Sequence, residues 1–147
     1  MNQRFEANNL IKAGEYLVQN RFYYHKEHFW AQIEDGSVRF GATDYGQKVL
    51  RDVVFVELPK IGDKVNQNEA YGTIESVKAV VDLIAPISGV VKEVNKTLQE
   101  TPDLINQDPY GKGWLILVTP TNLETELKNI LTFEAAVEWY KELSKGD

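Results

Sequence analysis

Short apolar runs separated by turn residues occupy most of the chain between Phe22 and Val118. β-Branched and aromatic residues fill these runs, and Gly, Pro, Asn or Asp bounds each of them. This spacing predicts strands, in the arrangement typical of a small β-sandwich or barrel. The turn "EDGS", residues 34–37, follows "FYYHKEHFWAQI" and predicts a β-hairpin. Five later runs predict further strands: "DVVFVEL", "EAYGTIES", "AVVDLIA", "GVVKEV" and "GWLILVT".

Two stretches have the signals of helices instead. "TDYGQKVL" predicts a short helix, which Asp44 caps, with Gln47 three residues later as in a capping box. The chain becomes helical over residues 121–144, where Thr121 and Glu124 form a second capping box. The last helix carries an apolar stripe at helical spacing, which predicts a face that docks against the sheet. The stripe consists of Phe133, Ala136, Val137, Tyr140 and Leu143.

The remaining segments are more polar. Residues 1–20 are rich in Asn and are expected to form an N-terminal extension. The apolar residues within them predict one short helix there: Leu10, Ile11, Tyr16, Leu17 and Val18. Residues 101–113, "TPDLINQDPYGKG", are expected to form a loop. Residues 21–147 are expected to fold as a single domain.

Composition excludes several classes of function. The 147 residues are 43% hydrophobic and 26% charged, which is typical of a soluble globular protein. The net charge of −6, without a run of Lys or Arg, argues against a nucleic-acid partner. The absence of cysteine excludes disulfides, thiol nucleophiles and zinc–thiolate sites. No signal peptide and no apolar stretch of roughly 20 residues is present, so we expect a cytoplasmic protein without a membrane partner.

A short internal repeat lies within the predicted strands. "LPKIGDKV" at residues 58–65 and "APISGVV" at residues 85–91 share an apolar residue, Pro, two further residues, Gly and then Val. Gly62 of the first copy and Gly89 of the second are 89 − 62 = 27 residues apart. The repeat predicts two similar turns in two half-sheets that face each other.

Lys78 lies between these two copies, in "TIESVKAVV". β-Forming residues on both sides predict a tight hairpin with Lys78 at or beside its tip. Spacing alone favours an ordinary lysine side chain that is exposed to solvent at the surface. A Schiff-base lysine would need a desolvating pocket to lower its pKa. A hairpin tip can also present a lysine amine for acylation, because the sheet holds its base still.

Several motifs in order along the chain are similar to those of one family. "TDYGQ", "DVVFVELPKIGDKV", "ESVKA" with Asp82, "DLIAPISGVVKEVN" and "DPYGKGWLI" resemble the H protein of the glycine cleavage system, a relative of lipoyl domains. Lipoyl domains carry glycines 16 residues before and 11 residues after the modified lysine. Here 78 − 16 = 62 and 78 + 11 = 89, which are Gly62 and Gly89. The resemblance thus identifies Lys78 as the attachment residue.

The resemblance also assigns roles to neighbours of Lys78. Glu75, three residues before it, matches the acidic residue that lipoate-attaching enzymes recognise. Val77 and Ala79 complete the motif on either side of the lysine. Between steps the family's loaded arm folds back into a cleft, for which the candidates here are His28, Trp30 and "TDYGQ". The implied fold is mainly β with flanking helices: a flattened β-barrel, or barrel-sandwich hybrid, with C-terminal helices.

The implied function is that of a carrier without catalytic residues of its own. Lipoic acid would be joined through an amide to Lys78 by a lipoate ligase or lipoyl transferase. The arm would take an aminomethyl group from glycine decarboxylase and present it to aminomethyltransferase. Dihydrolipoamide dehydrogenase would then reoxidise the dithiol. The absence of cysteine fits this role, because the redox-active sulfurs belong to the cofactor.

Three departures from the family pattern keep other hypotheses open. Phe29 replaces a common acid, Arg51 a glycine and Val81 a serine, all without affecting Lys78. A related carrier would bring sulfur to a heterodisulfide-reductase-like complex in sulfur oxidation. A third hypothesis is an interaction domain with an unmodified lysine. A biotinyl domain is disfavoured, because it flanks its lysine with methionines and the chain has only Met1.

Overall fold

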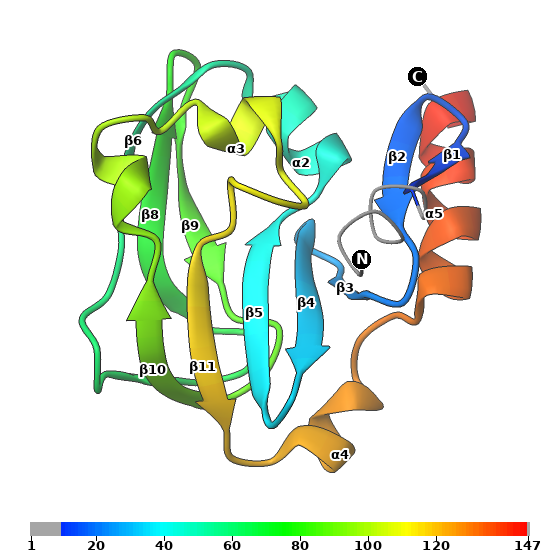
Figure 1. The fold of residues 1–147 in the computed structure, drawn as a ribbon. Helices are drawn as coiled ribbons and strands as arrows, with labels where there is room; N and C mark the ends of the chain where they lie inside the picture. The colour runs from blue at the N-terminus through cyan, green and yellow to red at the C-terminus, as the bar shows by residue number, and fades with distance from the viewer. Residues whose placement is uncertain (1–9, 147) are drawn as a thin grey trace, which may run out of the picture.

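The computed structural model describes residues 10–146, which form three antiparallel sheets. A six-stranded sheet, in the order β3-β4-β5-β11-β10-β7, lies in front of a three-stranded sheet, β6-β8-β9, in Figure 1. The remaining pair, β1-β2, lies beside the last helix. The strands are β1 (Leu10–Ala13), β2 (Tyr16–Gln19), β3 (Tyr23–His25), β4 (Phe29–Glu34), β5 (Ser37–Ala42), β6 (Val53–Glu57), β7 (Lys64–Val65), β8 (Ala70–Ser76), β9 (Val80–Ile84), β10 (Gly89–Val94) and β11 (Ile116–Pro120).

Short helices cover the ends of the sheets, and one longer helix ends the chain. They are α2 (Asp44–Leu50), the 3-10 helix η1 (Lys96–Gln99), α3 (Leu104–Gln107), α4 (Leu123–Leu127) and α5 (Phe133–Gly146). The prediction of a mainly β fold with flanking and C-terminal helices is confirmed. No helix within residues 10–146 is both long enough and apolar enough to cross a membrane.

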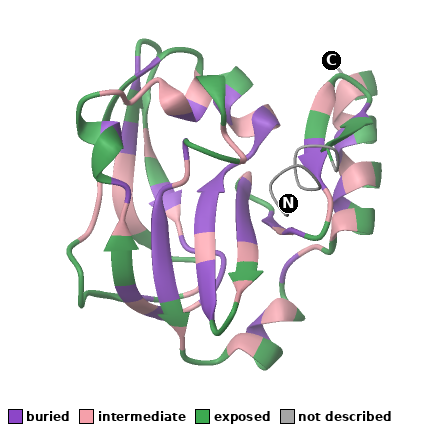
Figure 2. Ribbon diagram, viewed as in Figure 1, coloured by how far each residue is buried: buried purple, intermediate pink, exposed green. Residues whose placement is uncertain are grey.

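The core lies on both faces of the six-stranded sheet, which explains a break in the strand pattern. Phe29, Trp30 and Ala31 are consecutive on β4 and are all buried (Figure 2). Phe29 packs with Ile74 of the three-stranded sheet, whereas Trp30 packs on the opposite face with α5 and the β1–β2 hairpin. Successive strand residues point to opposite faces, so a strand covered on both sides is apolar throughout.

The hairpin predicted at "EDGS" is confirmed. Glu34 pairs with Ser37 across a two-residue loop in which Asp35 and Gly36 have φ angles of +39° and +79°. Positive φ at both central residues is typical of the type I′ turn, whose twist matches that of the flanking strands.

The helix predicted near the N-terminus is wrong for the residues that the structure describes; residues 1–9 of that segment lie outside them. Residues 10–19 form the β1–β2 hairpin, in which Ile11 pairs with Val18. Gly14, with φ of +65°, makes the turn, because an L residue resists this conformation. Ala13 and Val18 are fully buried in the same cluster as Trp30. The domain boundary at residue 20 stays a prediction.

Both predicted helix caps are shifted. Thr43, not Asp44, precedes α2, and its hydroxyl accepts the backbone N–H of Gly46. Asp44 instead accepts a hydrogen bond from the side chain of Gln47 within the helix. Asn122 occupies the cap position of α4, one residue after Thr121, and makes no capping hydrogen bond from its side chain.

Two further predictions concern the segment 101–113 and the last helix; the first is partly wrong and the second is confirmed. The segment 101–113 contains the single helical turn of α3, so it is not entirely a loop. The apolar stripe of α5 is confirmed as a docking face, since Ala136 and Tyr140 are buried. This face packs on the β1–β2 hairpin and on β3, at one edge of the large sheet.

The two copies of the internal repeat pair with each other within one sheet. The N–H of Gly62 donates to the carbonyl of Val91 at 2.8 Å, and β7 pairs with β10 so that Val65 faces Gly89. The prediction of two separate half-sheets is therefore wrong for these segments. Their turns also differ: Gly62 has a φ of +96°, whereas Gly89 lies in strand β10 and has no positive φ.

Candidate functional site

Lys78 lies at the tip of the β8–β9 hairpin, as the sequence predicts. The backbone N–H groups of Lys78 and Ala79 both donate to the side-chain hydroxyl of Ser76, at 3.1 Å. The N–H of Val77 donates to the carbonyl of Asp52, at 3.0 Å. These bonds fix the backbone of the turn, while the side chains of residues 77–80 remain exposed. Lys78 is thus an exposed side chain on an ordered tip.

The amine of Lys78 is directed toward helix α2. Its Nζ donates to the carbonyl oxygen of Val49 at 3.2 Å, in an exposed contact. Val49 belongs to the last turn of α2, whose carbonyls carry the negative end of the helix dipole. A cation at this place is stabilised modestly and remains accessible to solvent.

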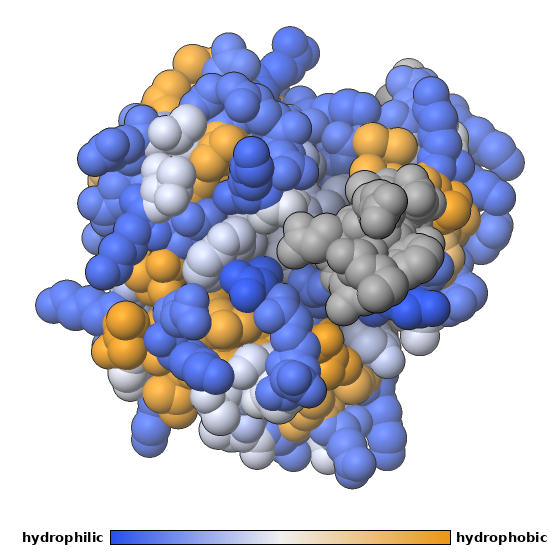
Figure 3. Space-filling model, viewed as in Figure 1, coloured by the Kyte–Doolittle hydropathy of each residue, from blue (hydrophilic) through white to orange (hydrophobic). Residues whose placement is uncertain are grey.

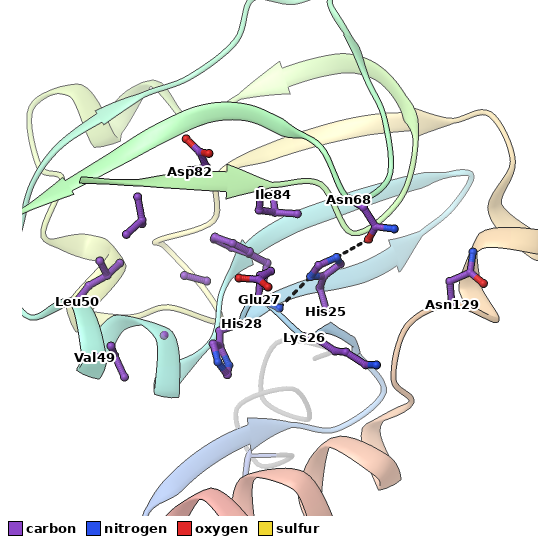
Figure 4. A pocket seen from close by; sticks show the side chains of 14 residues that line it. His25, Lys26, Glu27, His28, Val49, Leu50, Asn68, Asp82, Ile84 and Asn129 are labelled. Atoms are coloured by element: carbon purple, nitrogen blue, oxygen red, sulfur yellow. Dashed lines mark hydrogen bonds between the residues drawn. The ribbon is translucent and has the colours of Figure 1, made fainter. Parts of the chain in front are cut away.

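A cleft of about 740 Å³ begins beside this contact, because Val49 also lines it. Its walls come from α2, from β9 and from the turn between β3 and β4. In Figure 4, His25, Asn68 and Asn129 lie toward one end of the cleft, and Leu50 lies toward the other. The apolar part of the lining consists of Phe29, Ala42, Val49, Leu50, Val81 and Ile84.

His28 is held in the wall of the cleft by aromatic neighbours. Its ring stacks on Trp139 of α5 and lies against Tyr45 of α2, with centroid distances of 4.9 and 4.3 Å. Its Nδ1 is hydrogen-bonded to the hydroxyl of Tyr140 at 3.0 Å. Burial, with a smaller contribution from the nearby His25, lowers the pKa of His28 to about 4. The imidazole is therefore neutral at pH 7.

His25 organises the polar end of the cleft. Its Nε2 lies 2.6 Å from Oδ1 of Asn68, and its Nδ1 accepts the backbone N–H of Glu27 at 2.9 Å (Figure 4). Both ring nitrogens therefore have partners, which fix the orientation of the imidazole at this end of the cleft. Asn68, which forms this contact with His25, has a φ of +71°, a conformation that Asn tolerates better than most residues.

Three charged residues border the cleft: Lys26, Glu27 and Asp82. The carboxylate of Asp82 points away from the cavity, to the other face of β9 (Figure 4). Within residues 10–146, neither carboxylate forms an ion pair. Lys26 and Glu27 carry opposite charges, so the charged side chains beside the cavity can pair with either a cation or an anion.

The cleft candidates from the sequence separate into two groups. His28 lines the cleft, and Gly46 represents "TDYGQ" in its wall. Trp30 does not, since it is fully buried and its indole N–H donates to the carbonyl of Pro109 at 3.0 Å. Sequence reasoning missed His25 and Asn68, because 43 residues separate them and neither belongs to a motif.

The other predicted site residues lie either near the tip of the β8–β9 hairpin or beyond its base. Glu75 is exposed on β8, and Val77 and Ala79 flank Lys78 in the turn. Gly62 and Gly89 lie beyond the base of this hairpin, where β7 pairs with β10, so they shape the scaffold and not the tip. The attachment role of Lys78 and the recognition role of Glu75 stay predictions.

Comparisons with known proteins agree on one family. The family model described as "Glycine cleavage H-protein" matches residues 22–143. The probable glycine cleavage system H protein of Pyrococcus abyssi is 49% identical over 135 residues, covering 91% of this chain and 100% of the relative. The glycine cleavage system H protein of Geobacillus kaustophilus is 51% identical over 111 residues, covering 76% and 87%.

A solved structure supports the same assignment. The crystal structure of a glycine cleavage system H protein from Mycobacterium marinum matches with a TM-score of 0.66 and 37% identity, covering 81% of this chain and 98% of that one. The sheet arrangement described above is accordingly a barrel-sandwich hybrid of the lipoyl-domain type. The chain belongs to the glycine cleavage H-protein family.

Proposed function

We propose that this chain is the cytoplasmic lipoate carrier of a glycine cleavage system, with lipoic acid joined as an amide to Lys78. A lipoate ligase or lipoyl transferase would attach the group. When bound, lipoate would supply a dithiolane able to carry an aminomethyl group, and glycine decarboxylase, aminomethyltransferase and dihydrolipoamide dehydrogenase would be the partner enzymes. One observation carries the proposal: the Lys78 amine is hydrogen-bonded to Val49, and Val49 lines the cleft.

The residues present fit such an arm. Lys78 is exposed on an ordered tip, so its amine is accessible to an attaching enzyme. The nearby cleft has an apolar wall that includes Val81 and Ile84 of β9, next to helix α2. Burying an alkyl chain there is favourable by about 0.8 kcal/mol for each methylene group. This wall can hold a hydrocarbon arm while its base remains tethered.

Glu27 provides a binding partner for an aminomethyl cargo beside the cleft. An aminomethyl group is cationic when protonated, and the carboxylate of Glu27 would attract it. Phe29, which stands where the family commonly has an acid, removes one carboxylate, and Glu27 supplies another two residues earlier on the chain.

The chain itself would perform no chemistry. His28 lies half-buried in the wall of the cleft, packed against the rings of Trp139 and Tyr45, and its imidazole is neutral at pH 7. These contacts let His28 support the wall of the cleft. They do not provide the adjacent base that would activate a nucleophile. The carrier's contribution is to keep one intermediate near each active site at high effective concentration.

The test is an exchange reaction with the lipoylated protein. Glycine decarboxylase, glycine and labelled bicarbonate are incubated with the carrier, and exchange of the glycine carboxyl carbon is followed. We expect exchange with the wild type and none with Lys78→Arg, which offers no acylated amine. Mass spectrometry confirms lipoylation beforehand.

Two outcomes would contradict the proposal. A fully lipoylated carrier without exchange would exclude the aminomethyl role, and transfer of sulfur to a heterodisulfide-reductase-like complex would then be tested. A protein that never accepts lipoate would instead support the interaction-domain hypothesis.

A further inference from the structure

Three residues form a continuous row across the outer face of the three-stranded sheet. Phe55 of β6 pairs with Glu75 of β8, and Glu75 pairs with Val80 of β9. Residues directly opposite each other on neighbouring strands point to the same face. All three are exposed, Phe55 by 54% and Val80 by 63% of their surfaces. We call them the Phe55–Glu75–Val80 row.

This row lies on the other side of the sheet from the core and the cleft. The next row inward consists of Val56, Ile74 and Val81; Val56 and Ile74 are buried, and Val81 lines the cleft. Since neighbouring strand residues alternate between faces, a protein bound to the outer row would leave the cleft free.

The row is apolar at both ends and acidic in the middle. Within residues 10–146, Glu75 forms no ion pair. The following row adds Glu57 and Asp82, both exposed, on either side of Thr73. Hydrophobic residues also gather at the hairpin end of the molecule in Figure 3, where Val77 is exposed. An exposed aromatic residue among such neighbours is a typical anchor of an interface.

We propose that the Phe55–Glu75–Val80 row is the docking surface for the enzyme that attaches lipoate to Lys78. Its partner surface would present a Lys or Arg to Glu75, between two apolar depressions for Phe55 and Val80. The inference rests on the proposed function, because it requires that Lys78 be acylated. It extends that function from a single acidic recognition residue to a surface with an aromatic anchor.

The attaching enzyme is the partner that fits this position. It must bring Nζ of Lys78 itself into its active site, so it has to contact the residues beside the hairpin tip. Enzymes that act on the far end of a long arm have no such need. In the acylation, Nζ leaves the carbonyl of Val49 and loses a proton. The neutral amine then attacks the acyl carbon of an activated lipoyl anhydride or thioester; the C–N bond forms as the C–O or C–S bond breaks.

The test measures lipoylation of the unmodified full chain by a purified lipoate ligase with lipoate and ATP. Mass spectrometry follows initial rates at several carrier concentrations. We expect Phe55→Ala to lower kcat/KM about tenfold, mostly through KM, as truncation of an interface anchor does. Val80→Thr keeps the β-branched shape and should lower kcat/KM by a few-fold through loss of apolar contact.

Ile61→Ala is the matched control. Ile61 is 62% exposed in the turn between β6 and β7, outside the row, so its truncation should leave kcat/KM within about twofold of the wild type. Melting temperatures of all variants show whether each is folded. Wild-type kinetics for both Phe55→Ala and Val80→Thr would overturn the inference, as would an equal loss in Ile61→Ala.

A second measurement separates this partner from glycine decarboxylase. Each variant is first lipoylated to completion by long incubation and then assayed for carboxyl exchange. We expect exchange equal to that of the wild type. A comparable loss of exchange would overturn the inference by assigning the row to glycine decarboxylase. Failure of the wild type to accept lipoate would overturn the proposed function itself.

Discussion

The imidazole of His28 and the indole of Trp139 stack with an interplanar angle of 9° and a centroid distance of 4.9 Å. His28 lies at the β3–β4 turn and Trp139 on α5, so this contact joins the wall of the cleft to the C-terminal helix. His28 adopts a φ of +75°, a conformation that packing must maintain. The geometry of the cleft therefore depends on an element more than 100 residues away.

The lowered pKa of His28 predicts a loss of stability in mild acid. The folded state holds His28 neutral down to about pH 4, whereas the unfolded chain protonates it near its ordinary value of 6.5. Between these values the unfolded state binds more protons, so the free energy of unfolding falls as the pH falls through this window. Urea unfolding at pH 7 and at about pH 5 measures this fall.

His28→Asn provides the comparison, because Asn tolerates positive φ and does not titrate. The variant should lose less stability than the wild type between the two pH values. An identical fall in both proteins would show that protonation of His28 does not contribute.

Tyr71→Phe should stabilise the protein. The Tyr71 hydroxyl is buried without a hydrogen-bond partner within the described residues, and burial raises its pKa far above the ordinary value. Removing an unsatisfied hydroxyl recovers its desolvation cost, on the order of 1 kcal/mol. Chemical denaturation at pH 7 measures the gain.

Tyr110→Phe is the matched control for Tyr71→Phe. The Tyr110 hydroxyl donates to the carbonyl of Leu17 at 2.7 Å and accepts the N–H of Asp44 at 3.2 Å. Its loss should destabilise the protein by about 1–2 kcal/mol. Equal effects of the two substitutions would contradict the assigned hydrogen bonding.

Substitution of the two repeat glycines should have unequal effects. A Cβ at Gly89 would lie 2.6 Å from the carbonyl oxygen of Thr119, a backbone atom on the paired strand. Gly89→Val should therefore damage folding by crowding, with a loss of about 2 kcal/mol or more. Gly62→Ala meets only open space and carries the cost of its positive φ, about 1 kcal/mol. Denaturant midpoints that rank the variants in the opposite order would contradict this account.

Lys78→Arg should abolish lipoylation and leave the fold unchanged. The turn is fixed by Ser76 through backbone groups, and the exposed Lys78 side chain makes one surface hydrogen bond. Its replacement should change the free energy of unfolding by less than about 0.5 kcal/mol. Mass spectrometry and thermal melting check both parts. A lipoylated or unfolded variant would disagree with this expectation.

The strands and the hairpin tip could be predicted because their signals are local. β-Branched residues bounded by turn residues specify β6, β8, β9, β10 and β11 without reference to the rest of the chain. The position of Lys78 at the tip followed from the same pattern. The spacing of Lys78 from Gly62 and Gly89, interpreted through the family resemblance, indicates the attachment residue.

The features that could not be predicted from the sequence depend on contacts between distant segments. The residues of β1 and β2 are too few to distinguish a helix from a hairpin, and burial of Val18 against α5 decides between them. The cleft brings together His25 and Asn68 from separate strands and loops. Only the assembled sheets reveal that Phe55 and Val80 flank Glu75.

The β1–β2 hairpin and α5, the first and last elements within residues 10–146, pack together at one side of the molecule. The backbone N–H of Glu15 donates to Oγ of Ser144 at 2.9 Å, and the two elements lie side by side, away from the β8–β9 tip (Figure 1). A dye, a bead or a second protein attached near Gly146 would therefore project beside the β1–β2 hairpin and not from the β8–β9 tip that carries Lys78. The carrier could be immobilised on a support through this end while its lysine still faced the enzymes supplied in solution.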